Sequence, residues 1–275
     1  MNRLVELRRR ASRTYRRYRN PLRPDEFRRA LDELGLRQSD ILFVHSSLSA
    51  MGRFTAGLED IVDALGDVCG TLGLPTHTYS YPEASGAPAA VFDPATTPSR
   101  NGLFTEYFRR RPEAVRSVHS THSLAMQGPE AGEMTMDHYQ SDTPCGAGTP
   151  YARMIEARAS ALLLGVSFHS YTFFHTAEDA ADSPFAYEDG ILDILRVLDE
   201  AGEVRQCVSR RQTRNARRFA SCGDLIERAG LARRGALGAG TITFVPDCAK
   251  VHDFLVERLR VTPDFLYAEC AAPLN

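Results

Sequence analysis

Residues 161–179, with the sequence ALLLGVSFHSYTFFHTAED, constrain the fold of this chain more than any other segment. The apolar run from Ala161 to Val166 predicts a short strand that is buried on both faces of a sheet. A polar loop from Ser167 to Tyr171 follows, and Thr172 is a candidate N-cap for a helix that begins at Phe173. A buried strand followed by a loop and a helix is typical of an α/β sheet.

Two polar residues of this predicted helix form a candidate catalytic pair. His175 and Glu178 are three residues apart, so their side chains lie on one face of the helix. Open α/β sheets bind ligands at the carboxyl ends of their strands, and the helix begins just past such an end. His175 is therefore a candidate general base with a carboxylate in reach. The alternative is a structural histidine that caps the helix, and the spacing alone does not separate the two.

The rest of the chain continues the alternation of strands and helices. The patterns predict strands at 41–45, 71–78, 203–208 and 241–245, an extended segment at 115–126, and helices at 25–34, 58–68, 103–110, 149–158, 191–198, 222–229 and 249–259. Residues 81–101 are rich in proline, alanine and serine and predict a long loop. This order predicts one layered α/β domain with a mixed central sheet and helices on both faces.

Composition argues against several classes of protein. The net charge of −2 gives no general attraction to nucleic acid, and no apolar run approaches the ~20 residues of a membrane span. Six cysteines occur singly, which favours a reduced, cytoplasmic protein over a disulfide scaffold. Eleven arginines fall within residues 1–30. We interpret residues 1–24 as a basic N-terminal lead segment, in preference to a nucleic-acid arm or a transit peptide.

Six stretches of the chain carry short motifs in a fixed order. They are Val44-His45-Ser46-Ser47-Leu48 with Gly52, Gly70-Thr71-Leu72 with Pro75 to Ser80, Phe92-Asp93-Pro94 with Thr97 to Gly102, Arg116-Ser117 with Thr121-His122-Ser123, Asp142 to Gly146 with Pro150-Tyr151-Ala152, and Leu163-Leu164-Gly165 with Thr172 to Glu178. In this order they resemble the aminoglycoside 3-N-acetyltransferase family of antibiotic N-acetyltransferases, which is unrelated in fold to the GNAT acetyltransferases. The resemblance covers about residues 25–260 and identifies residues 25–275 as an acetyltransferase-like α/β domain.

The resemblance implies a transferase that uses acetyl-CoA as co-substrate, needs no metal and acetylates a small amine or amino sugar. It implies that His175 is the general base and that Glu178 orients the ring and stabilises its charged form. A base is needed because an alkylamine has a pKa around ~10.4 and must lose its proton before it attacks the thioester. The expected partners are coenzyme A and a small amine, not nucleic acid or a membrane, with a homodimer as one assembly open to the protein.

Candidate binding residues lie in the matched loops. The candidate coenzyme A contacts follow the strand at 41–45 or lie within 81–101, and they are Ser46, Ser47, Leu48, Thr97, Ser99 and Arg100. Small residues, hydroxyls and a guanidinium are groups that bind pantetheine and phosphates. Ordinary turns and loop capping are the structural alternatives for these residues. Tyr79, His122 and Ser123 are candidate substrate contacts, whereas His45 is predicted to be structural.

One stretch departs from the family pattern. Members that modify aminoglycosides tend to carry an acidic pair around an aromatic residue, where this chain has Arg217-Arg218-Phe219-Ala220. Residues 205–218 contain six arginines and no acid, and on one side of a helix bordering the cleft these would repel a polycation. The expected acceptor is therefore a small mono-amino compound, and an aminoglycoside resistance enzyme is the alternative.

Two further classes remain open at this point. Four histidines and a carboxylate are potential metal ligands of a hydrolase, although they form no His-Glu-x-x-His pattern: His119, His122, His169, His175 and Glu178. A family member that binds coenzyme A or a sugar without turnover is the other alternative.

Overall fold

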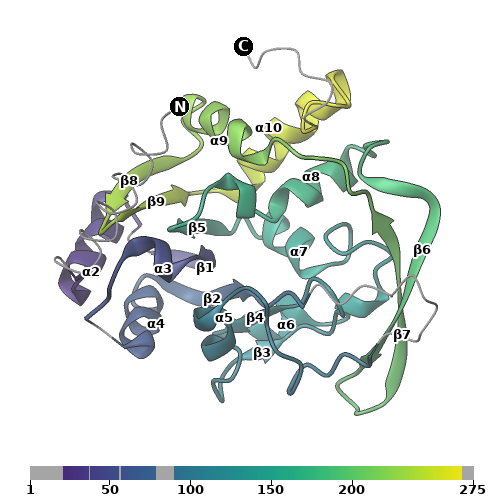
Figure 1. The fold of residues 1–275 in the computed structure, drawn as a ribbon, viewed down its shortest axis with the longest axis horizontal. Helices are drawn as coiled ribbons and strands as arrows, with labels where there is room; N and C mark the ends of the chain where they lie inside the picture. The colour runs from purple at the N-terminus through teal and green to yellow at the C-terminus, as the bar shows by residue number, and fades with distance from the viewer. Residues whose placement is uncertain (1–20, 37, 56, 79–89, 268–275) are drawn as a thin grey trace, which may run out of the picture.

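The central element is a mixed sheet (Figure 1). The computed structural model describes residues 21–36, 38–55, 57–78 and 90–267. In this part of the chain seven strands follow the order β3-β4-β2-β1-β5-β9-β8. Their bounds are β1 Ser39–Ser46, β2 Cys69–Pro75, β3 Val115–Arg116, β4 Leu124–Gln127, β5 Ser160–Leu164, β8 Arg233–Leu237 and β9 Gly240–Val245. β1 pairs in parallel with β2 and β5, and the other neighbours are antiparallel.

Strand β1 explains why the sheet is apolar on both faces. Ile41 and Phe43 pack into one core cluster, and Leu42 and Val44 pack into a second cluster on the opposite face. Successive side chains of a strand point to opposite faces, so a strand between two cores is a continuous apolar run. The same rule accounts for β5, which is buried at every residue.

Helices cover both faces, as the sequence predicted. One face is covered by α2 (Pro24–Glu33), α3 (Leu48–Met51), α4 (Leu58–Gly66) and α5 (Leu103–Phe108). The other is covered by α6 (Ala131–Thr135), α7 (Pro150–Glu156), α8 (Phe173–Ala180), α9 (Phe219–Arg228) and α10 (Cys248–Val261). Two 3₁₀ turns, η1 (His138–Gln140) and η2 (Phe168–Ser170), complete the elements on this side. The predicted α/β fold with a mixed sheet is therefore confirmed.

Local sequence signals set some helix starts and miss others. The Thr149 side chain accepts a hydrogen bond from the Ala152 backbone, with Pro150 at the first position of α7. Thr172 occupies the N-cap position of α8 as predicted, but its side chain makes no capping hydrogen bond. The predicted extended segment at 115–126 is only partly a strand, because residues 117–123 form a buried loop between β3 and β4.

The largest difference from the sequence prediction lies at residues 191–198, where a helix was expected. The segment belongs to strand β6 (Tyr187–Leu198), which forms an antiparallel hairpin with β7 (Val204–Gln212). Leu195 and Val197 are buried, while Ile194 is 59% exposed. This alternation of buried and exposed residues has the period of two that is typical of a strand. The apolar residues also fit a helical spacing, and pairing with β7 decides between the two. Figure 1 shows this hairpin along the side of the molecule opposite β8.

The lead segment and the cysteines are described only in part. Residues 1–20 and Cys270 lie outside the described residues. Leu22 is buried and forms a parallel β-bridge with Phe54, just before α2 begins at Pro24. Each of the five cysteines within the described ranges is a free thiol. No helix in the described part of the chain is both long and apolar enough to cross a membrane.

We expect Gly223→Ala to destabilise the protein by about 1–3 kcal/mol, because overpacking a core contact has a cost of this size. A Cβ atom at Gly223 in α9 would lie 2.5 Å from a ring carbon of buried Phe168 in η2. The matched control is Gly132→Ala in α6, where nothing lies within 4 Å of an added Cβ. Thermal unfolding should show a lower Tm for Gly223→Ala and an equal or higher Tm for Gly132→Ala. Equal Tm values for Gly223→Ala and the wild-type protein would contradict the prediction.

Candidate active site

A cavity of about 280 Å³ lies at the carboxyl ends of the parallel strands β1, β2 and β5. The described residues that line it are His45, Ser46, Pro75, His77, Asn101, Thr105, His122, Val166, His169, Ser170, Tyr171, Thr172, His175 and Phe219. This is the usual ligand position of an open α/β sheet, because several strand ends and the loops that follow them meet there. The cavity is therefore the candidate active site.

His175 and Glu178 are in direct contact at one wall of this cavity. Both lie on α8, and the His175 Nδ1 atom lies 2.6 Å from the Glu178 Oε2 atom. An ionised carboxylate only accepts hydrogen bonds, so Nδ1 carries the proton and donates it to Glu178. This tautomer leaves Nε2 of His175 free to accept a proton. The sequence prediction that the two side chains share one face of a helix is confirmed.

Glu178 is held by two further side chains from distant parts of the chain. Its Oε1 atom accepts hydrogen bonds from Arg217 Nε, at 2.9 Å, and from the Tyr267 hydroxyl. The side chain is only 1% exposed. Burial alone would raise the pKa of Glu178, but the contacts with His175, Arg217 and Tyr267 outweigh it and lower that pKa to about 2. The carboxylate is therefore ionised at any pH at which the protein would work.

Buried histidines form much of the cavity wall. The His122 ring centroid lies 6.3 Å from that of His175 and 4.8 Å from that of His77. Burial lowers the pKa of His77 and of His45 to about 3, and it lowers the pKa of His122 well below its usual value. These rings are neutral near pH 7, and each then carries one N–H donor and one acceptor nitrogen.

His45 reaches the cavity, although the sequence analysis gave it only a structural role. It is the penultimate residue of β1, and its ring is 3% exposed. Its Nε2 atom has no hydrogen-bond partner among the described residues. A buried polar atom without a partner is costly, so a bound molecule is a natural partner for the ring.

The predicted coenzyme A contacts after β1 differ in their positions. Of Ser46, Ser47 and Leu48, Ser46 lines the cavity in the described structure. The Ser47 backbone donates to the Leu164 carbonyl of β5, and the Ser47 hydroxyl lies 3.3 Å from that of Ser49. Leu48 packs partly buried against the core on the α2–α5 face. The loop is thus fixed to the neighbouring strand, with Ser46 at the cavity.

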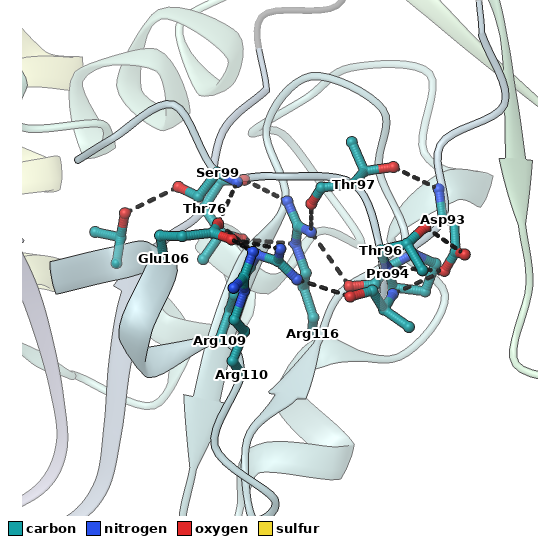
Figure 2. Close-up of polar contacts among 12 residues, drawn as sticks. Thr76, Asp93, Pro94, Thr96, Thr97, Ser99, Glu106, Arg109, Arg110 and Arg116 are labelled. Carbon is teal, nitrogen blue, oxygen red and sulfur yellow. Dashed lines mark hydrogen bonds and ion pairs between the residues drawn. The ribbon is translucent and has the colours of Figure 1, made fainter. Parts of the chain in front are cut away.

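Figure 2 shows that Thr97 bonds within its own loop, whereas Ser99 bonds to helix α5. The Thr97 hydroxyl accepts from the Asp93 backbone, and the Ser99 hydroxyl lies 2.9 Å from that of Thr105. Buried Arg116 ties the loop to β2 by donating to the carbonyls of Thr97 and Thr76 (Figure 2).

Neither Thr97, Ser99 nor exposed Arg100 is among the described residues that line the cavity. Their loop nevertheless ends at Asn101, which does line it. The Arg100 backbone donates to the His77 carbonyl and so joins the loop to the end of β2.

The three candidate substrate contacts have different outcomes. His122 lines the cavity. Ser123 lies behind it, fully buried, where its hydroxyl donates to the Thr76 carbonyl at 2.8 Å. Tyr79 lies outside the described residues.

Several lining residues were not predicted as site residues from the sequence, and they are His77, Asn101, Thr105, Tyr171 and Phe219. His169 also lines the cavity, although it was named only as a potential metal ligand of the hydrolase alternative. His77 and Asn101 belong to motifs that were matched, and a position just past a strand end was the available signal for His77. Phe219 is brought to the site by α9, and its ring centroid lies 5.3 Å from that of His175. No local pattern indicates such a contact between distant segments.

The expected arginine face on a helix is wrong, because residues 204–212 form strand β7. Arg205 and Arg211 on this strand form ion pairs with Asp199 and Asp193 of the same hairpin. Arg217 is the arginine of this stretch that pairs with a residue of the site, Glu178. The argument that these arginines repel a polycationic acceptor therefore loses its geometric basis.

The types of side chain in the cavity wall limit the ligands that it can bind. Among the described lining residues there is no aspartate or glutamate. The described residues also contain no group of three or more histidines, cysteines or acids that could hold a metal ion. The chemistry available at this wall is therefore that of imidazole, amide and hydroxyl groups, with the Glu178 carboxylate behind His175.

The chain is similar to known acetyltransferases over most of its length. The family model described as aminoglycoside 3-N-acetyltransferase matches residues 43–260. Aminoglycoside N(3)-acetyltransferase VII of Streptomyces paromomycinus is 31% identical over 260 residues, which cover 80% of this chain and 85% of the relative. Aminoglycoside N(3)-acetyltransferase IX of Micromonospora chalcea is 29% identical over 262 residues, which cover 86% and 92%.

Solved structures give the same result for the fold. The crystal structure of aminoglycoside acetyltransferase AAC(3)-Xa superposes with a TM-score of 0.77 at 28% identity, covering 93% of this chain and 98% of that one. The AAC-IIIb binary structure with CoASH has a TM-score of 0.77 at 25% identity, covering 92% and 100%.

We expect the free energy of unfolding to fall as the pH drops below about 6.5. The folded-state pKa is about 3 for His45 and His77 and about 4 for His138, so the unfolded chain binds protons that the folded protein does not. The stability from these neutral rings is complete above about pH 6.5 and is lost progressively below it, at about 1.4 kcal/mol per pH unit for each ring. Urea unfolding at about pH 7.5, 6.5 and 5.5 measures this slope.

The control for this prediction is His138→Gln, which keeps a polar group between Ser117 and the Pro144 carbonyl. It should reduce the loss of unfolding free energy between about pH 6.5 and 5.5 by about 1 kcal/mol, because an unfolded histidine with a pKa of about 6.5 goes from about half to about nine-tenths protonated over this range. A free energy of unfolding that is the same at these pH values would contradict the prediction that the folded protein keeps these histidines neutral.

Proposed function

The chain belongs to the aminoglycoside 3-N-acetyltransferase family and is an acyl-CoA-dependent N-acyltransferase, and from this premise we propose that it transfers the acetyl group of acetyl-CoA to an amino sugar, with His175 as the general base. The observation that carries the proposal is the His175–Glu178 contact at the cavity wall. Glu178 fixes the ring with Nδ1 protonated, so Nε2 is the atom that takes a proton from the acceptor amine.

Each step of the reaction has a group at the cavity to serve it. The amine nitrogen attacks the thioester carbonyl carbon, and the new N–C bond forms as His175 Nε2 takes a proton. The C–S bond then breaks, and the proton passes from His175 to the departing coenzyme A sulfur. Glu178 is ionised and stabilises the imidazolium that exists between these two steps.

The carbonyl oxygen needs donors as it becomes an oxyanion. Neutral His122 lines the same cavity, and its Nδ1 atom lies 2.8 Å from the Thr121 hydroxyl. In the tautomer in which that hydroxyl donates to Nδ1, the Nε2 atom carries the proton and can donate it to the oxyanion as a hydrogen bond. Neutral donors suit this role, because they stay neutral at the pH where His175 must be unprotonated.

The acceptor that we propose is an amino sugar or other small amine with few positive charges. Binding a polycation takes facing carboxylates, and hydrogen bonds to charged groups are worth about 1.5–3 kcal/mol each. The described lining residues supply none. The second candidate is a polycationic aminoglycoside, and it is favoured by the similarity to aminoglycoside N(3)-acetyltransferases VII and IX.

We expect His175→Gln to lower kcat by roughly 10²–10⁴-fold, because a general base acts in the transition state. Affinity for acetyl-CoA should change little, and an unchanged rise in Tm with added acetyl-CoA would report this. His252→Gln is the matched control, since His252 also faces a carboxylate, that of Asp253, but lies on α10 away from the cavity. Near-normal turnover in folded His175→Gln protein would exclude the proposed base.

The acceptor is tested by steady-state kinetics on kanamycin-type drugs and on neutral or anionic amino sugars with a single amine. Release of the coenzyme A thiol reports each turnover. We expect higher kcat/KM for the mono-amino sugars, because each extra ammonium group loses its water without gaining a carboxylate. Clearly higher kcat/KM for the drugs would reject this preference and establish aminoglycosides as the acceptors, with the reaction class unchanged.

A further inference from the structure

Arg217 lies in the segment between β7 and α9 and connects it to the catalytic pair, although none of the reaction steps above uses this residue. Its Nε atom donates to Glu178 Oε1 at 2.9 Å, while His175 Nδ1 donates to Oε2 at 2.6 Å. The Tyr267 hydroxyl is the second donor to Oε1. Each carboxylate oxygen therefore has a fixed set of partners, and the oxygen that faces His175 cannot rotate away without breaking an ion pair.

Building on the proposed role of His175, we propose that Arg217 is a positioning residue that holds Glu178 in place and opposes protonation of His175. The guanidinium acts through Glu178 and does not need to touch either substrate. Its positive charge compensates the buried carboxylate, so that the unprotonated ring, which is the active base, persists to lower pH.

The surroundings of Arg217 fix the guanidinium in this position. Its side chain is 13% exposed, and Nη1 donates to the Thr213 carbonyl at 3.1 Å. Nη2 lies 3.4 Å from the Ala186 carbonyl, and the guanidinium carbon lies 5.4 Å from the Tyr267 ring centroid. The residue thus joins the two ends of the β6–β7 hairpin and the segment after α10 to the catalytic pair.

The two histidines, the cysteine and the tyrosine that lie around the pair are neutral near pH 7. Burial lowers the pKa values of His77 and His122, and it raises those of Cys145 and Tyr267. Asp179, the next residue along α8, accepts a hydrogen bond from Tyr187. Arg217 is therefore the positive charge that balances Glu178, since arginine stays protonated in proteins.

Removing the positive charge of Arg217 changes the protonation of His175 in a predictable direction. With the Glu178 carboxylate uncompensated, the charged imidazolium form of His175 is favoured more strongly. A larger share of the enzyme is then in the inactive, protonated form at low pH. The acidic limb of the kcat/KM profile therefore moves to higher pH.

The test compares pH profiles of kcat/KM for the full-length enzyme and its Arg217 variants, with acetyl-CoA and one acceptor throughout. Because the acceptor is the same in every profile, its own ionisation cancels. Arg217→Gln keeps a donor for Glu178 without the charge, and Arg217→Met removes both. We expect both to move the acidic limb upward by about one pH unit, a common effect of one nearby charge. Arg217→Lys should restore the limb close to its wild-type position.

The matched control is Arg211→Met, which breaks another arginine pair with a buried carboxylate, that of Asp193 on the same hairpin. It should leave the acidic limb where it is in the wild-type enzyme. The inference fails if folded Arg217→Gln or Arg217→Met loses turnover while the acidic limb of its pH profile stays at the wild-type position. That outcome would indicate that Arg217 has a purely structural role. Two neutral variants are used so that misfolding of one still leaves a profile to measure.

A parallel measurement on His175→Gln separates this inference from the proposed function. If His175→Gln retains turnover, His175 is not the base and both proposals fall. If it loses turnover while the neutral Arg217 variants keep the wild-type limb, the base stands and the inference about Arg217 is wrong.

Discussion

The parallel pairing of β1 with β5 and β2 is the constraint on which the rest of the molecule depends. These strands are buried on both faces, so they can carry polar side chains only where they end. The carboxyl ends of all three strands point the same way, because the strands are parallel. His45 at the end of β1, His77 past β2 and α8 after β5 therefore meet at one cavity. The position of the site follows from the sheet, and its chemistry from the loops.

The site holds one ionised carboxylate and several neutral histidines in a largely buried environment. Burying a charged carboxylate and polar ring nitrogens costs stability, and hydrogen bonds offset that cost. Glu178 accepts hydrogen bonds from three donors, and His77 and Tyr151 form a hydrogen bond of 2.8 Å. The result is a rigid wall in which tautomers are set by neighbours. Such preorganisation suits acetyl transfer, where orientation and oxyanion stabilisation account for much of the barrier reduction.

Two segments outside the sheet complete the wall. The loop before α5 is held by Arg116, which donates to the Thr97 carbonyl within the loop and to the Thr76 carbonyl just past β2 (Figure 2). This loop brings Asn101 to the cavity. The β6–β7 hairpin covers a small apolar cluster of its own with Leu195, Val197 and Cys207. The turn after the hairpin then delivers Arg217 to Glu178. The loop thus supplies Asn101 to the cavity wall, whereas the segment after the hairpin supplies the Arg217 side chain behind that wall.

The sequence by itself determined the α/β class, the shared helical face of His175 and Glu178, and the buried strand that was predicted at 161–166 and lies at Ser160–Leu164. Each of these depends on residues only a few positions apart, where periodicity and capping act directly. Tertiary structure decided the rest. The segment 191–198 fits a helix or a strand until β7 pairs with it, and Glu178 acquires Arg217 and Tyr267 from 39 and 89 residues away. Contacts of that separation depend on how the chain closes around its cores, which no local pattern encodes.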